Sequence, residues 1–185
     1  MHSSQIQGYF DIPVDHLYAS PVIYKKLQEL DMQPLVVASP DVGGIKTARS
    51  YAEKLKGSLV LVDKRRPAHN VAEIATIIGE VENKNVLIVD DMIDTGSTFV
   101  KCAEALKDKG ANQIYGAIVH PVFSGKALDL IENSYGIDKL FITDTIPLKR
   151  KVDKIEIISI SELIGEAILR TYDNRSISSL FDIAR

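Results

Sequence analysis

The sequence predicts an α/β fold with a mostly parallel sheet flanked by helices, and two observations carry the prediction. Short apolar runs alternate along the chain with amphipathic helical patterns, which is typical of a sheet built from strand–helix–strand units. Each run is apolar at consecutive positions, as expected of strands that are buried on both faces. The runs are Leu35–Ala38, Leu59–Val62, Val86–Val89, Ile114–Val119, Leu140–Ile142 and Ile155–Ile158.

A helix is expected before the first strand. Ser20 and Pro21 are typical of a helix start, because a proline there lacks an N–H group that would have no partner in the helix. The apolar pattern that follows predicts an end near Asp31. Ile74–Val81 is expected to form an additional strand that turns at Asn83.

Four further helices connect the later strands. In the second of them Phe99 and Cys102 share one apolar face, and Gly110 is the expected stop of that helix. Ser159 and Glu162 have the spacing of a capping box at the start of the last helix. The four expected helices are Ile45–Leu55, Ser97–Lys109, Gly125–Asn133 and Ser161–Tyr172.

Length and composition favour one domain over residues 1–185 and exclude several classes of protein. The chain has 22 Lys and Arg against 25 Asp and Glu, a net charge of −3, which argues against a nucleic-acid partner. No apolar run approaches the roughly 20 residues of a membrane span. The single cysteine excludes an internal disulfide and fits a reducing, cytoplasmic location, and no signal peptide is visible.

The strongest motif follows the apolar run that ends at Val89. Two carboxylates come first, and then a turn rich in hydroxyl groups opens a helix, where exposed N–H groups favour a phosphate. The carboxylates can accept hydrogen bonds from vicinal sugar hydroxyls, directly or through a metal. The motif therefore predicts a site for a sugar phosphate. Its residues are Asp90, Asp91, Asp94, Thr95, Gly96, Ser97 and Thr98.

A second loop, after the first strand, is expected at the same edge of the sheet. Paired glycines bring backbone N–H groups close to a ligand, and the carboxylate can hold a metal ion. The loop suits pyrophosphate chelated to Mg²⁺, although alone it is also compatible with an ordinary turn between strand and helix. Its residues are Asp41, Val42, Gly43 and Gly44.

A third loop, with the sequence Asp63-Lys64-Arg65-Arg66-Pro67, is strongly basic. Such a run is usually a solvated patch, but this one leaves the same edge of the sheet as the two anion sites. Positioned cations stabilise the charge that develops in phosphoryl transfer. In an extended segment Lys64 and Arg66 would point into the site together, with Arg65 directed away.

These motifs resemble the ribose-phosphate pyrophosphokinase family, also called phosphoribosyl pyrophosphate synthetase. The resemblance also covers His2–Pro13 near the start of the sequence and Ser176–Phe181 near its end. It implies a type I phosphoribosyltransferase-like fold and transfer of the diphosphoryl group of ATP to the C1 hydroxyl of ribose 5-phosphate. The chain resembles only the C-terminal half of that family, so the N-terminal half is expected to be absent, and the isolated chain to bind ribose 5-phosphate without full turnover.

The resemblance also implies individual roles. His2 and Asp41 would hold Mg²⁺, and Lys64 and Arg66 would act on the transferring phosphates. In the family, phosphate and ADP act as effectors at contacts of a homo-oligomer. By motif, the corresponding regulatory residues here are Gln7, Ser176, Ser178 and Phe181.

Two alternatives to a synthetase remain open from the residues, and a third, a phosphoacceptor aspartate, is discounted. A phosphoribosyltransferase would share the phosphate motif but would need a hood over the base, for which no extra segment is visible. A non-catalytic, synthetase-associated subunit would be expected to have lost the basic loop or the hydroxyl turn, and both are intact. A phosphoacceptor aspartate would leave the hydroxyl turn unexplained.

Overall fold

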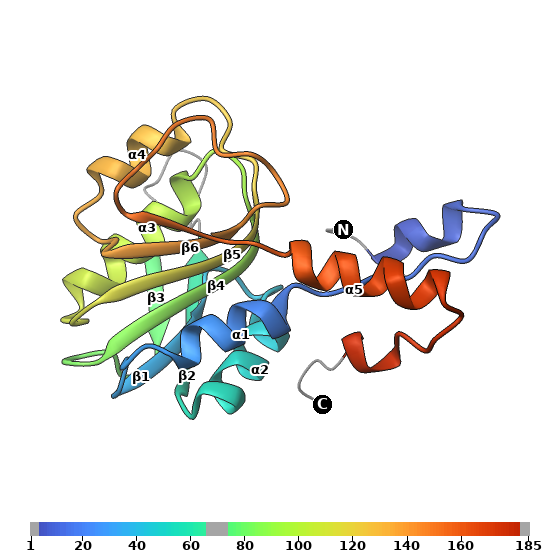
Figure 1. The fold of residues 1–185 in the computed structure, drawn as a ribbon. Helices are drawn as coiled ribbons and strands as arrows, with labels where there is room; N and C mark the ends of the chain where they lie inside the picture. The colour runs from blue at the N-terminus through green and yellow to red at the C-terminus, as the bar shows by residue number, and fades with distance from the viewer. Residues whose placement is uncertain (1–3, 66–73, 182–185) are drawn as a thin grey trace.

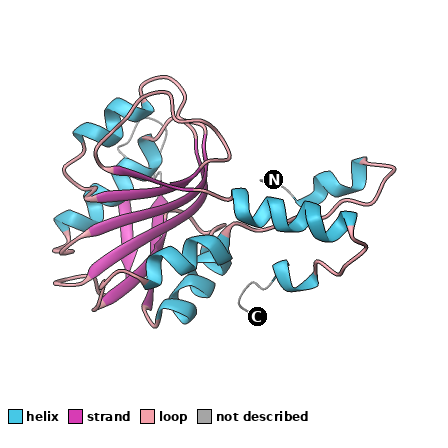
Figure 2. Cartoon of the chain, in the orientation of Figure 1, coloured by secondary structure: helices cyan, strands magenta, loops and turns pink. Residues whose placement is uncertain are grey.

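The computed structural model describes residues 4–65 and 74–181, which form a seven-stranded sheet with helices on both faces (Figures 1 and 2). The strand order is β3-β2-β1-β4-β5-β6-β7, and every neighbouring pair is parallel except β2 and β3. The strands are β1 (Leu35–Ser39), β2 (Ser58–Arg65), β3 (Ile74–Ile78), β4 (Asn85–Ile93), β5 (Ile114–Pro121), β6 (Lys139–Thr143) and β7 (Ile155–Ile158). This architecture confirms the predicted fold class.

The order in which successive strands are placed in the sheet reverses at β1. Successive strands first run outward from β1 to β2 and β3, and the chain then returns to place β4 on the other side of β1. Val36 accordingly pairs with Ser58 of β2 on one side and with Val86 of β4 on the other. In open α/β sheets such a reversal leaves a crevice at the carboxyl ends of the two strands, where ligands bind.

The helices that cover the sheet are α1 (Ser20–Gln28), α2 (Ile45–Leu55), α3 (Ser97–Asp108) and α4 (Ala127–Asn133), and α5 (Ser161–Tyr172) follows β7. Each face of the sheet has its own core, because successive residues of a buried strand point to opposite faces. In β4, Leu87 and Val89 join the core under α1 and α2, whereas Val86 and Ile88 join the core under α3 and α4. Both cores explain the consecutive apolar residues of the sequence.

Most expected elements agree with the structure, and the differences lie at their ends. The first helix ends at Gln28 rather than near Asp31, and the extra strand ends at Ile78 rather than Val81. The capping box predicted at the start of α5 is wrong. The N-cap residue is Ile160, which makes no side-chain hydrogen bond, and the Ser159 hydroxyl, one residue earlier, donates to Asp144 and accepts from the Ser161 N–H.

Three short elements lie to one side of the sheet, away from the helices that cover it (Figure 1). These are α5, the 3₁₀ helix η1 (Ser4–Tyr9) and the 3₁₀ helix η2 (Ser178–Phe181), which we call the α5 arm. Arg170 of α5 donates to the Ser179 hydroxyl and to the Ser176 carbonyl and so holds η2 against the helix. No helix in the described part of the chain is long and apolar enough to cross a membrane.

One face of α5 exposes apolar side chains to solvent. Ile164, Ile168 and Tyr172 follow at intervals of four, with Leu169 beside them, and their exposed fractions are 40%, 65%, 83% and 49%. Residues at this spacing lie on the same side of a helix. None of the residues of α5 is buried.

Candidate functional site

The reversal between β1 and β4 brings two of the three predicted loops together. The strands are parallel neighbours with Leu35 opposite Asn85 and Ala38 opposite Ile88, so they end at the same edge of the sheet. The loop after β1 contains Asp41 to Gly44, and the turn after β4 contains Asp94 to Gly96. Two predicted anion-binding segments that are 50 residues apart in sequence therefore lie at the same edge of the sheet.

Asp90 and Asp91 lie inside β4 rather than after it. The strand continues beyond Val89 because its last residues still pair with β5, with Asp90 opposite Ile118 and Met92 opposite His120. Alternation along the strand directs Asp90 and Asp91 to opposite faces, and Asp90 is the less exposed of the two. The sequence pattern correctly predicts that both carboxylates lie near the carboxyl end of the strand. It does not predict that they point to opposite faces of the sheet.

The Asp90 carboxyl group has a pKa that is raised to about 7. Burial is the largest cause, because it disfavours the charged form. The Asp91 N–H donates to Asp90 Oδ1 over 2.9 Å and lowers the pKa, whereas the negative charges of Asp91 and Asp41 raise it. The pKa of Asp90 in β4 thus depends in part on the charge of Asp41 in the loop after β1. A hydrogen bond from a sugar hydroxyl, or a nearby cation, would stabilise the charged form of this carboxyl group.

Asp90→Asn is expected to stabilise the protein at high pH. Because the pKa of Asp90 is about 7 in the folded chain against 3.8 ordinarily, the folded state holds the extra proton between these values, and stability falls as pH rises from about 4 to 7. Asparagine keeps the acceptor for the Asp91 N–H and never ionises. Urea unfolding should show the variant about 1 to 2 kcal/mol more stable at pH 8, after allowance for solvent screening, with the gain vanishing near pH 4. An equal gain at both values of pH would contradict this origin.

The predicted phosphate cradle lies at the N-terminus of α3. Gly96 is its N-cap residue, with φ +80°, a conformation that glycine adopts without strain. No side chain caps this end of the helix. Thr95, just before the helix, and Ser97 and Thr98, its first two residues, are exposed beside its first N–H groups. Such a helix end with surrounding hydroxyl groups is suited to bind a phosphate.

A loop that no sequence motif predicts forms hydrogen bonds with the segment that precedes α3. After β5, the Phe123 N–H donates to the Ile93 carbonyl and the Ser124 N–H donates to the Asp94 carbonyl. Both Phe123 and Gly125 have positive φ values, of 47° and 58°. The glycine is the only local signal of this loop in the sequence, and the helix predicted to start with it in fact begins at Ala127.

The loop after β1 closes tightly around its own backbone. Asp41 Oδ1 accepts a hydrogen bond from the Gly44 N–H over 2.9 Å, and the Ser39 hydroxyl donates to the Asp41 carbonyl over 2.6 Å. A Cβ atom on Gly44 would lie 2.4 Å from Ser39 Oγ, so only glycine fits there without a shift. Asp41, Val42 and Gly43 are exposed at the rim of the crevice, as a ligand-binding loop requires.

The third predicted loop is only partly described. Lys64 and Arg65 belong to β2, where Lys64 pairs with Ala75 of β3, so the basic run begins inside the strand rather than after it. Arg66 and His2 lie outside the described residues, so the roles expected of them stay predictions. The described ranges contain no group of three or more His, Cys, Asp or Glu side chains that would hold a metal ion. Carboxylate oxygens such as those of Asp41 are nevertheless the ligands that Mg²⁺ prefers.

The expected regulatory residues gather on the α5 arm rather than at the crevice. Gln7 belongs to η1, and Ser178 and Phe181 belong to η2. The Ser176 hydroxyl donates to Ser178 Oγ over 3.1 Å, and the segment is tied to α5 through Arg170. The structure thus separates these four residues from the phosphate cradle.

The comparisons with known proteins agree with this geometry. The model of the family described as the phosphoribosyl synthetase-associated domain matches residues 64–182. The chain is 52% identical over 184 residues to ribose-phosphate pyrophosphokinase from Chlorobaculum tepidum, covering 98% of this chain and 57% of the relative. It is 50% identical to ribose-phosphate pyrophosphokinase from Thermotoga maritima, covering 98% of this chain and 58% of the relative. The chain thus spans somewhat more than half the length of these relatives.

Solved structures extend the comparison to the fold. The crystal structure of phosphoribosylpyrophosphate synthetase from Mycobacterium smegmatis has a TM-score of 0.85 and 30% identity, covering 94% of this chain and 57% of that one. Orotate phosphoribosyltransferase from Aeropyrum pernix has a TM-score of 0.51 and 20% identity, covering 81% of this chain and 76% of that one. The second likeness bears on the fold alone and agrees with the expected phosphoribosyltransferase-like architecture.

Proposed function

The chain belongs to the family described as the phosphoribosyl synthetase-associated domain, and from this premise we propose that it takes part in transferring the diphosphoryl group of ATP to the C1 hydroxyl of ribose 5-phosphate. In this reaction the C1 oxygen bonds to the β-phosphorus of ATP. The bond from that phosphorus to the oxygen bridging the α- and β-phosphates breaks. AMP leaves, the hydroxyl proton passes to solvent, and 5-phosphoribosyl 1-diphosphate is formed for nucleotide biosynthesis.

One observation supports the proposal above the others: the uncapped N-terminus of α3 and the loop from Asp41 to Gly44 flank the same crevice. Ribose 5-phosphate and a diphosphoryl group together present two phosphate-bearing ends that are joined through a sugar. The names of the relatives favour a synthetase over a phosphoribosyltransferase or a non-catalytic subunit.

The proposed roles of the residues rest on the sequence motifs and on the resemblance to the family. The N–H groups at the start of α3, with the hydroxyls of Thr95, Ser97 and Thr98, bind the 5-phosphate. Asp90 and Asp91 accept hydrogen bonds from the ribose hydroxyls, and the raised pKa of Asp90 favours such a partner. Lys64 and Arg66 neutralise charge on the transferring phosphates. Holding both substrates in line supplies most of the rate in such a transfer.

Mg²⁺ is the proposed cofactor, with Asp41 and His2 as its protein ligands. The exposed carboxylate of Asp41 and the negative potential that it shares with Asp90 and Asp91 fit a hard divalent cation. When bound, the ion would offset the negative charge of the phosphates. The remaining proposals are a homo-oligomer, ADP or phosphate effectors that act at the arm, and a cytoplasmic location.

Calorimetric titration of the purified chain with ribose 5-phosphate, ATP and a nucleobase tests this function. With Mg²⁺ present, saturable binding of ribose 5-phosphate is expected, together with little binding of ATP, because the chain spans only 57% of its relative. Binding of a nucleobase in the presence of phosphoribosyl diphosphate, without binding of ribose 5-phosphate, would replace the synthetase with a transferase. Absence of any sugar-phosphate binding would refute the assignment of the cradle.

A further inference from the structure

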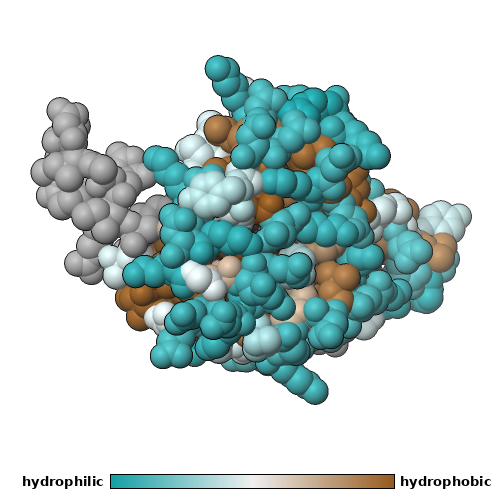
Figure 3. All heavy atoms as spheres, turned by 90° about the vertical axis from the view of Figure 1, so that its left-hand side faces the viewer, coloured by the Kyte–Doolittle hydropathy of each residue, from teal (hydrophilic) through white to brown (hydrophobic). Residues whose placement is uncertain are grey.

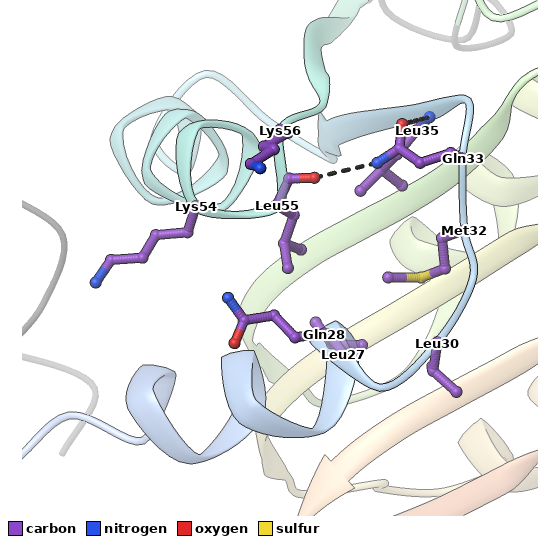
Figure 4. A pocket seen from close by; sticks show the side chains of 9 residues that line it. All are labelled: Leu27, Gln28, Leu30, Met32, Gln33, Leu35, Lys54, Leu55 and Lys56. Atoms are coloured by element: carbon purple, nitrogen blue, oxygen red, sulfur yellow. Dashed lines mark hydrogen bonds between the residues drawn. The ribbon is translucent and has the colours of Figure 1, made fainter.

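The edge of the sheet opposite to the candidate site has a pocket of about 330 Å³ at the ends of α1 and α2 (Figure 4). Its apolar residues Leu27, Met32, Leu35 and Leu55 are buried in the core, and Figure 4 shows the Lys54 side chain directed away from the pocket. Figure 3 looks onto this edge and shows hydrophilic side chains over most of its surface. The residues of this pocket therefore favour no particular ligand, in contrast to two lysines at the edge that carries the candidate site.

The predicted phosphate cradle contains no basic residue of its own. The segment from Asp94 to Thr98 has one carboxylate, and the carboxylates of Asp90 and Asp91 precede it. A phosphate monoester carries a charge of about −1.5 to −2 at neutral pH. Because like charges repel, these carboxylates oppose the entry of a phosphate, and a cation near the cradle would strengthen its binding.

The loop between β6 and β7 contains three consecutive basic residues and runs beside α4 (Figure 1). The loop is held in place because Leu148 packs against the core and Val152 is buried in it. Arg150 binds Asp129 over 2.6 Å and Glu132 over 2.8 Å, so two carboxylates of α4 offset its charge. The three basic residues are Lys149, Arg150 and Lys151.

Lys149 contacts the loop that is hydrogen-bonded to the cradle. Its Nζ donates to the Phe123 carbonyl over 3.4 Å, and the N–H of the next residue, Ser124, donates to the Asp94 carbonyl over 2.9 Å. Through the peptide group between them, these bonds place Lys149 Nζ within about 9 Å of the Asp94 carbonyl oxygen. That distance is comparable to the screening length of about 8 Å at physiological ionic strength. The charge of Lys149 is therefore only partly screened at the cradle.

The contact between Lys149 and Phe123 does not explain the lysine by stability. It is longer than the usual range of such hydrogen bonds, about 2.7 to 3.2 Å, and is correspondingly weak. Within residues 4–65 and 74–181, no carboxylate forms an ion pair with Lys149, whose side chain is exposed. The ammonium group is thus accessible to an anion at this edge of the sheet.

A second lysine, Lys126, belongs to the loop between β5 and α4. It precedes Ala127, whose Cα atom would lie 3.4 Å from a Cβ atom added to Gly96, the N-cap residue of α3. Lys126 is therefore one residue away from direct contact with the cradle, and its side chain is exposed.

We propose that Lys126 and Lys149 attract the 5-phosphate of the sugar and so determine the preference of the site for a phosphorylated over an unphosphorylated sugar. The proposal rests on the function proposed above and adds two residues that none of the sequence motifs includes. The N–H and hydroxyl groups of the cradle supply hydrogen bonds, and the two lysines supply the positive charge that the cradle itself lacks.

Calorimetric titration of the Lys126→Gln/Lys149→Gln variant with ribose 5-phosphate tests the proposal. Its affinity should be about tenfold lower than that of the unaltered chain, because two positive charges near a phosphate are lost. The affinity should also vary less with KCl concentration, a change that a purely structural role would not produce. Binding of ribose, followed by NMR, should be unchanged. Lys126→Arg/Lys149→Arg keeps both charges and should bind ribose 5-phosphate within about twofold of the unaltered chain.

The matched control, Lys54→Gln/Lys109→Gln, removes the same charge from exposed positions near the opposite edge of the sheet. Lys109 is the C-cap residue of α3, about 18 Å along that helix from the cradle. An equal loss of affinity in this control would make net charge the cause and overturn the proposal. Normal binding by Lys126→Gln/Lys149→Gln would overturn this inference alone. Failure of the unaltered chain to bind ribose 5-phosphate would overturn it together with the proposed function.

Discussion

The Thr95→Val/Thr98→Val double variant is expected to bind ribose 5-phosphate about a hundredfold more weakly than the unaltered chain. Each substitution replaces a hydroxyl with a methyl group of similar size, so the turn before α3 keeps its backbone while it loses two hydrogen-bond partners for the phosphate. Hydrogen bonds to a charged group contribute about 1.5 to 3 kcal/mol each. Calorimetric titration at constant Mg²⁺ concentration measures the change.

The matched control for this variant is Thr171→Val. Thr171 is an exposed residue of α5, on the arm, and its hydroxyl donates only within the helix, to the Ala167 carbonyl. Its removal should leave the affinity for ribose 5-phosphate unchanged. Retention of normal affinity by the double variant would show that the 5-phosphate lies elsewhere, and the roles of the two loops would then have to be reassigned.

Gly44→Ala is expected to weaken the binding of magnesium pyrophosphate about tenfold and to destabilise the fold by about 1 to 3 kcal/mol. The added Cβ would lie 2.4 Å from Ser39 Oγ, which must then give up its 2.6 Å hydrogen bond to the Asp41 carbonyl. The loop would open and carry the Gly44 N–H away from Asp41 Oδ1. Thermal unfolding and pyrophosphate titration measure the two effects.

Gly165→Ala is the matched control: it adds the same methyl group as Gly44→Ala, but it is expected to cause no loss of stability or of pyrophosphate binding. A Cβ at Gly165, inside α5, would meet no atom within 4 Å. Alanine favours a helix over glycine by about 1 kcal/mol, so this variant should be no less stable than the parent and should bind pyrophosphate normally. If both alanine variants behaved alike, the close approach of Ser39 to Gly44 would not be the cause.

The sequence is sufficient to predict the elements of the fold but not the lengths of the strands that carry the site. Periodicity identifies a strand by its apolar residues, and β4 loses that signal at Asp90. The strand continues to Ile93 because Met92 and Ile93 pair with His120 and Pro121 of β5. Pairing between segments distant in sequence decides the boundary, and it leaves no local trace.

The sequence predicts the loops of the candidate site one by one, but it does not predict how the charges of neighbouring segments affect one another. Hydroxyl groups, glycines and carboxylates after apolar runs identify the cradle and the pyrophosphate loop from local chemistry. The influence of Asp41 on the pKa of Asp90 depends on β1 lying beside β4, and strand order is a property of the whole fold. The same limit applies to Ser159, because Ile160 rather than Ser159 is the N-cap residue of α5 and the Ser159 hydroxyl donates to Asp144, which is distant in sequence.

The exposed α5 implies that the chain does not unfold as one unit. A helix of 12 residues is near the length at which isolated helices are only marginally populated in water, and α5 has no buried side chain that ties it to the sheet. Its contacts with Ser176 and Ser179 are with η2, which belongs to the same arm. Leu163 and Ile164 in the first turn adjoin Val119 and His120 of β5, so we expect the helix beyond that turn to fray separately from the cooperative transition of the sheet. A melting temperature measured for this chain would then describe the sheet and its four covering helices rather than the arm.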